Sequence, residues 1–149
     1  MNSNDYMELA FREALAAEVR GEVPIGAVVV SPAGEVLACA GNEVEARNDP
    51  TAHAELLAIR AAGEKMGEPR LPGCDLYVTL EPCAMCATAA SFARIRRVVF
   101  GAYDPKGGGV EHGARIFSQP TCHHAPEVVG GVSAARAEQM LKGFFAVRR

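Results

Sequence analysis

Residues 75–86, DLYVTLEPCAMC, carry the strongest structural signal in this chain. Asp75 to Leu80 alternates and has β-branched or aromatic residues at several positions, which predicts a β-strand. Pro82 suits the first position of a helix, where a missing N–H group costs nothing. The stretch therefore predicts a strand that runs into a helix, with Cys83 and Cys86 at the junction. In α/β sheets, sites commonly lie where strands end and helices begin.

The segments on either side of this junction also alternate between helix and strand patterns. Upstream, we expect an amphipathic helix from an Asp5 N-cap to Gly21, a β-hairpin of Ile25–Val30 and Val36–Ala40, an irregular Asn42–Pro50, and a helix over Ala52–Ala62 after a Thr51 cap. Downstream, we expect a strand over Arg97–Ala102, a glycine-rich loop over Lys106–Gly109, a further helix and strand with the strand near Val128, and a C-terminal helix from about Ser133.

This order predicts an α/β sandwich with helices on both faces of a sheet, in a single domain over residues 1–149. The chain is 49% hydrophobic and 22% charged, close to the averages of globular proteins. Its longest apolar stretch, Val23 to Val30, is far shorter than the roughly 20 residues that cross a bilayer. We therefore expect no membrane span and a cytoplasmic location. The net charge of −3 argues against broad attraction to nucleic acid, although a local basic patch can still bind RNA.

Two short motifs supply the ligand types that a catalytic zinc ion prefers. Catalytic zinc is typically held by three protein ligands, often histidine and cysteine, with a fourth position open to water. His53, Cys83 and Cys86 make such a set, and a helix N-terminus helps cysteine ligands to deprotonate. Zinc lowers the pKa of a bound water to about 7, but another group must still carry that proton to the leaving group. Glu55, close after His53, is the candidate proton carrier.

The remaining cysteines and histidines favour a catalytic over a structural metal site. Five cysteines in a chain without a predicted export signal do not suggest a disulfide framework. A structural zinc ion needs a fourth ligand, and the spacing of the other candidates points to none: Cys39, Cys74, Cys122, His112, His123 and His124. A lone C-x-x-C also occurs in redox sites, which stays an alternative for Cys83 and Cys86. Cys39 and Cys74, in predicted strands, are expected to be buried.

The motifs His53-Ala54-Glu55 and Pro82-Cys83-Ala84-Met85-Cys86 match the H-x-E and P-C-x-x-C signature of zinc-dependent nucleobase deaminases. Flanking runs resemble the bacterial tRNA adenosine deaminases of the cytidine-deaminase-like superfamily, and this likeness covers nearly the whole chain. The runs are Val23–Val28, Asp49–Glu55, Leu76–Cys83, Arg94–Ile95 with Val98–Ala102, and Phe144–Phe145 with Arg148. The zinc motif is common to the superfamily, whereas the flanking runs favour the tRNA enzymes.

The resemblance implies a three-layer α/β/α sandwich around a five-stranded mixed sheet, one zinc ion per chain, and a homodimer. It implies hydrolytic deamination of adenosine to inosine at the wobble position of an arginine tRNA, with the anticodon stem-loop as partner. By the same likeness, Asn42 would hydrogen-bond the flipped base, and Asp104 and Lys106 would line the groove for neighbouring nucleotides. As the simpler alternatives, Asn42 is a turn residue, and Asp104 and Lys106 belong to a solvated turn.

Some positions depart from the family pattern. Phe92 stands where better-known members have histidine, His123–His124 stands where they have Asn-His, and residues 107–113 lack their small-residue pattern. These departures leave a free nucleobase deaminase, such as a guanine deaminase, as an alternative function. An inactive subunit or a structural-zinc module is a further alternative, but neither would need Glu55, so its presence argues against both. A phosphate-binding rim is the hypothesis for a set of basic residues, with solvated surface as the alternative: Arg94, Arg96, Arg97, Lys106, Arg148 and Arg149.

Overall fold

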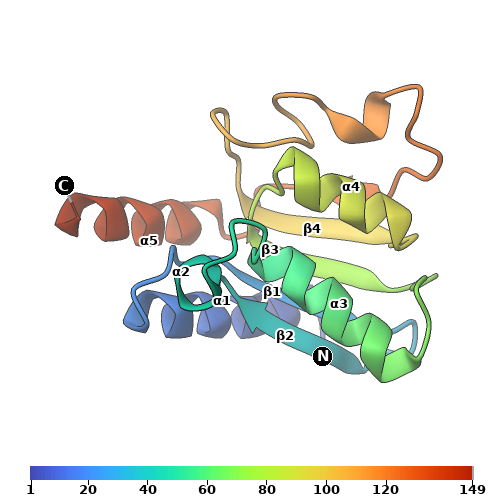
Figure 1. Ribbon diagram of the computed structural model, residues 1–149, viewed down its shortest axis with the longest axis horizontal. Coiled ribbons are helices and arrows are strands. Elements are labelled where there is room, and N and C mark those ends of the chain that lie inside the picture. Colours follow the sequence, from blue (N-terminus) through green and yellow to red (C-terminus); the bar gives the residue numbers. More distant parts are fainter. Residues whose placement is uncertain (149) are drawn as a thin grey trace.

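The computed structural model describes residues 1–148, which form a mixed sheet covered by helices (Figure 1). The helices are α1 (Ser3–Val19), α2 (Val44–Arg47), α3 (Ala54–Met66), α4 (Ala84–Phe92) and α5 (Ala134–Val147). The strands are β1 (Gly26–Val30), β2 (Val36–Gly41), β3 (Asp75–Leu80), β4 (Arg97–Ala102) and β5 (Glu127–Val129). Within the described residues, none of the helices is both long and apolar enough to span a membrane.

The five strands lie in the order β2-β1-β3-β4-β5. β1 pairs antiparallel with both β2 and β3, while the β3–β4 and β4–β5 pairs are parallel. Parallel neighbours need a crossover, and α4 supplies the one between β3 and β4. The carboxyl ends of β3 and β4 therefore meet at one edge of the sheet, where the sequence placed the junction with Cys83 and Cys86.

Helices cover both faces of this sheet, as the three-layer prediction requires (Figure 1). One apolar cluster joins α3 and α4 to the sheet through small and branched residues such as Ala58, Ala90 and Val78. A second cluster joins α1 and α5 to the other face through residues such as Phe11, Val99 and Ala137. Because both faces are covered, the central strands β1 and β3 are buried along nearly their whole length.

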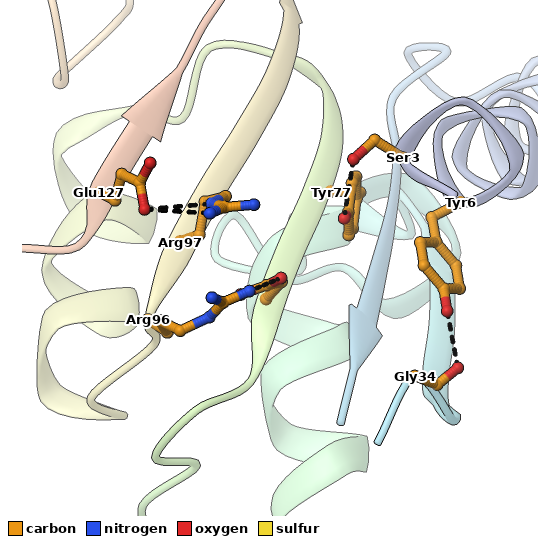
Figure 2. Close-up of polar contacts among 8 residues, drawn as sticks. Ser3, Tyr6, Gly34, Tyr77, Arg96, Arg97 and Glu127 are labelled. Carbon is orange, nitrogen blue, oxygen red and sulfur yellow. Dashed lines mark hydrogen bonds and ion pairs between the residues drawn. The ribbon is translucent and has the colours of Figure 1, made fainter. Parts of the chain in front are cut away.

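Helix α1 packs closely on the sheet because Gly26 has no side chain. A Cβ atom at Gly26 would meet the backbone oxygen of Ala10, so any other residue would force the helix away. Toward the N-terminal end of the helix, the Tyr6 hydroxyl donates to the Gly34 carbonyl at 2.7 Å (Figure 2). These contacts fix α1 on the hairpin that precedes the site.

At the amino ends of β3 and β4, ion pairs tie neighbouring strands together. Nε and Nη2 of Arg96 donate to the Asp75 carboxylate at 2.9 and 2.6 Å. Arg97 donates from the same two atoms to Oε2 of Glu127, both at 3.2 Å (Figure 2). The amino-end edge is therefore held by side chains that are already paired.

Three predicted helix starts are wrong, each for a local reason. Helix α1 begins at Ser3, because Asn2 and Asp5 form a reciprocal capping box and Asp5 is its third helical residue. Helix α3 has His53 as its N-cap, because Thr51 is held by the Asp49 carboxylate in a turn before the helix. Helix α4 has Cys83 as its N-cap. The helix starts later than predicted because the N–H of Glu81 still donates to the Ala102 carbonyl and so extends the pairing of β3 with β4.

The remaining differences lie in connections and on an edge. The sequence did not predict α2, which falls inside the irregular Asn42–Pro50 segment. The helix expected between β4 and β5 is a single 3-10 turn, Ile116–Ser118. Cys74 is buried as expected, but Cys39 is exposed, since it lies on β2, which has a neighbour on one side only.

Candidate active site

Three side chains converge at the carboxyl end of β3, where two helices begin. His53 is the N-cap of α3, Cys83 is the N-cap of α4, and Cys86 lies in the first turn of α4. The ligand atoms of these residues all lie within 4.8 Å of one another. Among residues 1–148, no fourth histidine, cysteine or carboxylate joins this group. The arrangement therefore offers three ligands and leaves a fourth position for another molecule.

The spacing of these atoms fits a tetrahedral zinc ion. Zinc–nitrogen bonds of about 2.0–2.1 Å and zinc–sulfur bonds of about 2.3 Å place nitrogen and sulfur roughly 3.6 Å apart at tetrahedral angles. Nδ1 of His53 lies 3.6 Å from Sγ of Cys83 and 3.7 Å from Sγ of Cys86. The soft sulfur and imidazole donors also suit zinc better than magnesium or calcium. These residues can hold zinc without rearrangement.

The cluster favours a charged ligand at Cys83. A hydrogen bond with the Cys86 thiol, together with His53, lowers the pKa of Cys83 to about 4. The same bond, followed by burial, raises the pKa of Cys86 above its ordinary value. The hydrogen bond with Cys83 raises the pKa of His53 more than burial lowers it. These pKa shifts favour a thiolate at Cys83, and a divalent cation would favour deprotonation of the second thiol as well.

Glu55 lies in the first turn of α3 and is buried beside the two cysteines. Burial raises the pKa of Glu55 to about 7, and the charge of Cys83 acts in the same direction. A group whose pKa lies near the working pH both accepts and donates protons efficiently. Glu55 therefore has the protonation behaviour that a general acid and base needs.

A pocket of about 620 Å³ opens above His53, Glu55 and Cys83. This volume falls within the roughly 300–1,000 Å³ range of small-molecule sites. Asn42 also lines the pocket, and its Oδ1 accepts from the backbone N–H of Ala54 at 2.8 Å. Since the oxygen is committed to that bond, the amide nitrogen of Asn42 is the group left to donate to a ligand.

Two side chains from the segment before β1 hold Asn42 and the start of α2 that follows it. The buried carboxylate of Glu22 accepts from the backbone N–H groups of Glu45 at 3.0 Å and Ala46 at 2.8 Å. Nη2 of Arg20 donates to the carbonyl of Asn42 at 3.1 Å. Sequence reasoning assigned no role to Arg20 or Glu22, because their partners are backbone groups that leave no motif.

Asp104 and Lys106 lie on the loop after β4 and differ in position. Asp104 is half-buried and lines the pocket, and its Oδ1 accepts from the N–H groups of Lys106 at 3.3 Å and Gly107 at 3.0 Å. Lys106 is exposed and does not line the pocket. Asp104 thus joins the site, whereas Lys106 lies outside it on the same turn.

The sequence of residues 1–102 matches the family described as the cytidine and deoxycytidylate deaminase zinc-binding region. That span contains the three candidate ligands and Glu55. A tRNA-specific adenosine deaminase from Agrobacterium fabrum (strain C58) is 58% identical over 144 residues, which cover 97% of this chain and 94% of the relative. The chain belongs to the tRNA-specific adenosine deaminase family.

Solved structures place this family member within a wider group of deaminases. A structure from studies of A-to-I editing by tRNA:A34 deaminases at the wobble position of transfer RNA superposes with a TM-score of 0.90. It is 59% identical and covers 93% of this chain and 99% of its own. A guanine deaminase from Bacillus subtilis is 30% identical with a TM-score of 0.69, covering 99% of this chain and 94% of its own. The fold is therefore that of the cytidine-deaminase-like enzymes.

In this deaminase, the end of helix α5 forms a wall of the pocket; Arg148 was a candidate for phosphate binding, whereas no role in the pocket was predicted for Phe144 and Phe145. Phe144, Phe145 and Arg148 all line it. The guanidinium of Arg148 lies 3.5 Å from the centre of the Phe144 ring, and its Nη1 donates to the Phe144 carbonyl at 3.2 Å. The helix thus presents a fixed cation at the pocket. Arg149 lies outside the described residues.

The structure contradicts a single rim made of all the predicted basic residues. Arg96 and Arg97 lie at the amino end of β4 and are already paired with carboxylates. A parallel strand rises about 3.3 Å per residue, so the length of β4 puts roughly 16 Å between Arg97 and Ala102 at the pocket edge. Arg94 lines a separate groove beside Phe92 and His123. The prediction grouped Arg96 and Arg97 with Lys106 because they are close in the sequence, but these residues lie at opposite ends of β4.

Proposed function

We propose that this chain is a zinc-dependent tRNA adenosine deaminase that converts the wobble adenosine of an arginine tRNA to inosine. Residues 1–149 would form one catalytic domain, with one zinc ion held by His53, Cys83 and Cys86. The observation that carries the proposal is Glu55, a carboxyl group with a pKa near 7, beside a zinc-spaced ligand set on the floor of a pocket. The sequence identity of 58% to a tRNA-specific adenosine deaminase supports the substrate class.

Glu55 carries the protons of the proposed reaction. When bound, zinc lowers the pKa of a coordinated water molecule and so provides a nucleophile near neutral pH. Glu55 accepts a proton from water and delivers it to the ring nitrogen next to the carbon that bears the amine. It then takes the proton of the newly added hydroxyl group, which becomes the carbonyl of inosine, and passes this proton to the amine as the carbon–nitrogen bond breaks. Water and adenosine thereby give inosine and ammonia, and the glutamate returns to its starting state.

The pocket walls would bind the flipped base and its neighbours. Asn42 donates from its amide nitrogen to an acceptor on the purine, because its oxygen is already committed to Ala54. Asp104 and Lys106 would contact the flanking nucleotides from the loop after β4, and Arg148 would face a phosphate from α5. Flipping a base costs least in a single-stranded loop, which favours an anticodon loop as the substrate.

We further propose a homodimer that acts in the cytoplasm, on the basis of the family resemblance. Sedimentation at micromolar protein concentration tests the assembly. A species of twice the chain mass of 15.7 kDa supports a dimer, whereas a 15.7 kDa species alone would rule it out.

A substrate comparison tests the proposed function. The purified protein is incubated with an anticodon stem-loop that carries a wobble adenosine and, separately, with guanine, cytosine and cytidine. We expect inosine in the RNA and no turnover of the free compounds. A second stem-loop with guanosine at the wobble position is the matched control, since it leaves the fold of the RNA unchanged.

A guanine deaminase is the second candidate function. Its support is the 30% identity to the Bacillus subtilis enzyme over nearly the whole chain, together with a pocket large enough for a free purine. Rapid turnover of guanine with an untouched stem-loop would establish this alternative and overturn the tRNA substrate.

A further inference from the structure

Glu81 follows β3 directly and its side chain is completely buried, with 0% exposed. A buried carboxylate is costly unless donors surround it. Here five donors do so, and all of them come from the loop of residues 104–112. One carboxylate oxygen, Oε1, accepts from the N–H of Asp104 at 3.0 Å and lies 2.8 Å from Nδ1 of His112. The burial of Glu81 is therefore inseparable from the shape of this loop.

The second carboxylate oxygen of Glu81 accepts hydrogen bonds from three consecutive backbone N–H groups. Oε2 accepts from the N–H groups of Val110 at 3.2 Å, Glu111 at 2.9 Å and His112 at 3.1 Å. Hydrogen bonds to an ionised acceptor are stronger than those between neutral groups. The two oxygens of one side chain thus hold both ends of the loop.

The loop leaves no room for another arrangement at its centre. A Cβ atom at Gly108 would meet Oε2 of Glu81, and one at Gly109 would meet the backbone nitrogen of Ala84 at the start of α4. Gly109 also donates to the Pro82 carbonyl at 2.8 Å. The loop is therefore packed against both the carboxylate and the turn that carries Cys83.

A chain of hydrogen bonds connects Glu81 to the proposed nucleotide-binding residues. Glu81 fixes the N–H of Asp104, and the carboxylate of Asp104 in turn accepts from the N–H groups of Lys106 and Gly107. Both Asp104 and Gly107 line the pocket. Glu81 also lines the pocket, but its side chain is completely buried, so a change at Glu81 would move the pocket wall through the loop.

We propose that Glu81 is a positioning residue that sets substrate binding by holding the 104–112 loop against the pocket. We call its five contacts with this loop the lock; His112 supplies the only side-chain contact among them. The proposal rests on the proposed tRNA deaminase function for its substrate. It assigns Glu81 no contact with the base and no part in proton transfer. Its effect should appear in KM for the stem-loop, while kcat and zinc content stay close to those of the parent.

The test compares Glu81→Gln, Glu81→Ala and His112→Ala with the control Asp75→Asn, which alters a carboxylate at the opposite end of β3. Amide hydrogen exchange at residues 104 and 110–112 is measured without substrate, together with zinc content, kcat and KM for the stem-loop. Glutamine keeps one acceptor oxygen only, so we expect exchange at some of these amides and KM to rise about tenfold, with kcat within about threefold. His112→Ala should give a smaller change in the same direction, and Asp75→Asn none.

Each outcome decides a separate point. Faster exchange with a raised KM supports the lock, and if Glu81→Ala does not fold, Glu81→Gln and His112→Ala give the answer. Unchanged exchange in both of these variants overturns it, as does a fall in kcat at constant KM. Faster exchange with unchanged KM refutes the role in substrate binding. A parent protein that leaves the stem-loop untouched refutes the proposed function instead, because the exchange measurement needs no RNA.

Discussion

Strand β3 is bounded by two buried carboxylates whose partners differ in kind. Asp75, at the amino end, has a side chain that is 12% exposed and is bound by Arg96, whose side chain is 51% exposed. Glu81, past the carboxyl end, is bound by a loop through four backbone N–H groups and one imidazole. A single side-chain partner ties two strands together, whereas a set of backbone partners gives a loop its shape. The amino end of β3 therefore supports the fold, and its carboxyl end contributes to the candidate site.

This contrast extends across the sheet. The amino-end edge holds arginines that are neutralised by Asp75 and Glu127. The carboxyl-end edge holds the ligand cluster, Glu55 and the pocket. Substitutions at the two ends should therefore separate into effects on activity and effects on stability.

The largest expected effect is that of Glu55→Ala at the pocket end. A general acid or base contributes about 10²–10⁴ in rate, so kcat should fall by that factor while zinc content is unchanged. The matched control is Glu64→Ala, an exposed glutamate on the same helix α3. Steady-state kinetics with the stem-loop measure both variants, and activity of Glu55→Ala within threefold of the parent would contradict the assigned role.

Cys86→Ala should remove zinc as well as activity. Changes to groups that only support metal ligands cost about 10–100-fold in affinity or activity, so loss of a ligand should cost at least about 100-fold. Cys74→Ala is the control, since Cys74 is a buried thiol directly before β3, at the opposite end of that strand. Metal analysis after dialysis decides the assignment, and a full zinc content in Cys86→Ala would end it.

A smaller effect should distinguish Lys106 from Arg96, although both substitutions remove one positive charge. If Lys106 contacts a phosphate, Lys106→Ala weakens binding of the stem-loop and lowers the slope of log K against log salt by about 0.7–0.9. Arg96→Ala should leave the slope unchanged, because Arg96 is paired with Asp75 at the far edge. Titrations at several salt concentrations measure this, and equal slopes in the two variants would break the contrast between the edges.

The smallest effect on activity is expected for Asp75→Asn. The change weakens the pair with Arg96 and should lower Tm by roughly 2–4 °C, without altering kcat or KM. Thermal unfolding and kinetics on the same sample measure both quantities. A raised KM in this variant would mean that the two ends of β3 are coupled, and the contrast would then fail.

The sequence predicted those elements whose patterns are local. Strands β3 and β4 were expected over Asp75–Leu80 and Arg97–Ala102, and both occupy these bounds. Alternation and β-branching are properties of the segment itself, so no distant contact is needed to recognise them. The ligand cluster followed from motif spacing for the same reason, and the structure brings His53, Cys83 and Cys86 together.

Features that depend on distant partners were missed or wrong. Glu22 and Glu81 hold the pocket walls through backbone N–H groups of segments more than twenty residues away, and backbone groups leave no sequence signal. Arg96 and Arg97 were placed with Lys106 because they are close in the chain. Lys106 follows the carboxyl end of β4, whereas Arg96 and Arg97 lie at its amino end. This separation is apparent only once the strand has formed.

The lock on the 104–112 loop makes the wall of the pocket largely independent of the side chains on its outer surface. Backbone amides supply four of the five contacts to Glu81, while Pro105, Lys106 and Glu111 are exposed and do not line the pocket. Substitutions at these exposed positions should leave the backbone conformation of the loop unchanged, provided that Gly108 and Gly109 are kept. Selection for a different nucleic-acid context could therefore act on this loop one residue at a time and leave the metal-binding turn beneath it intact.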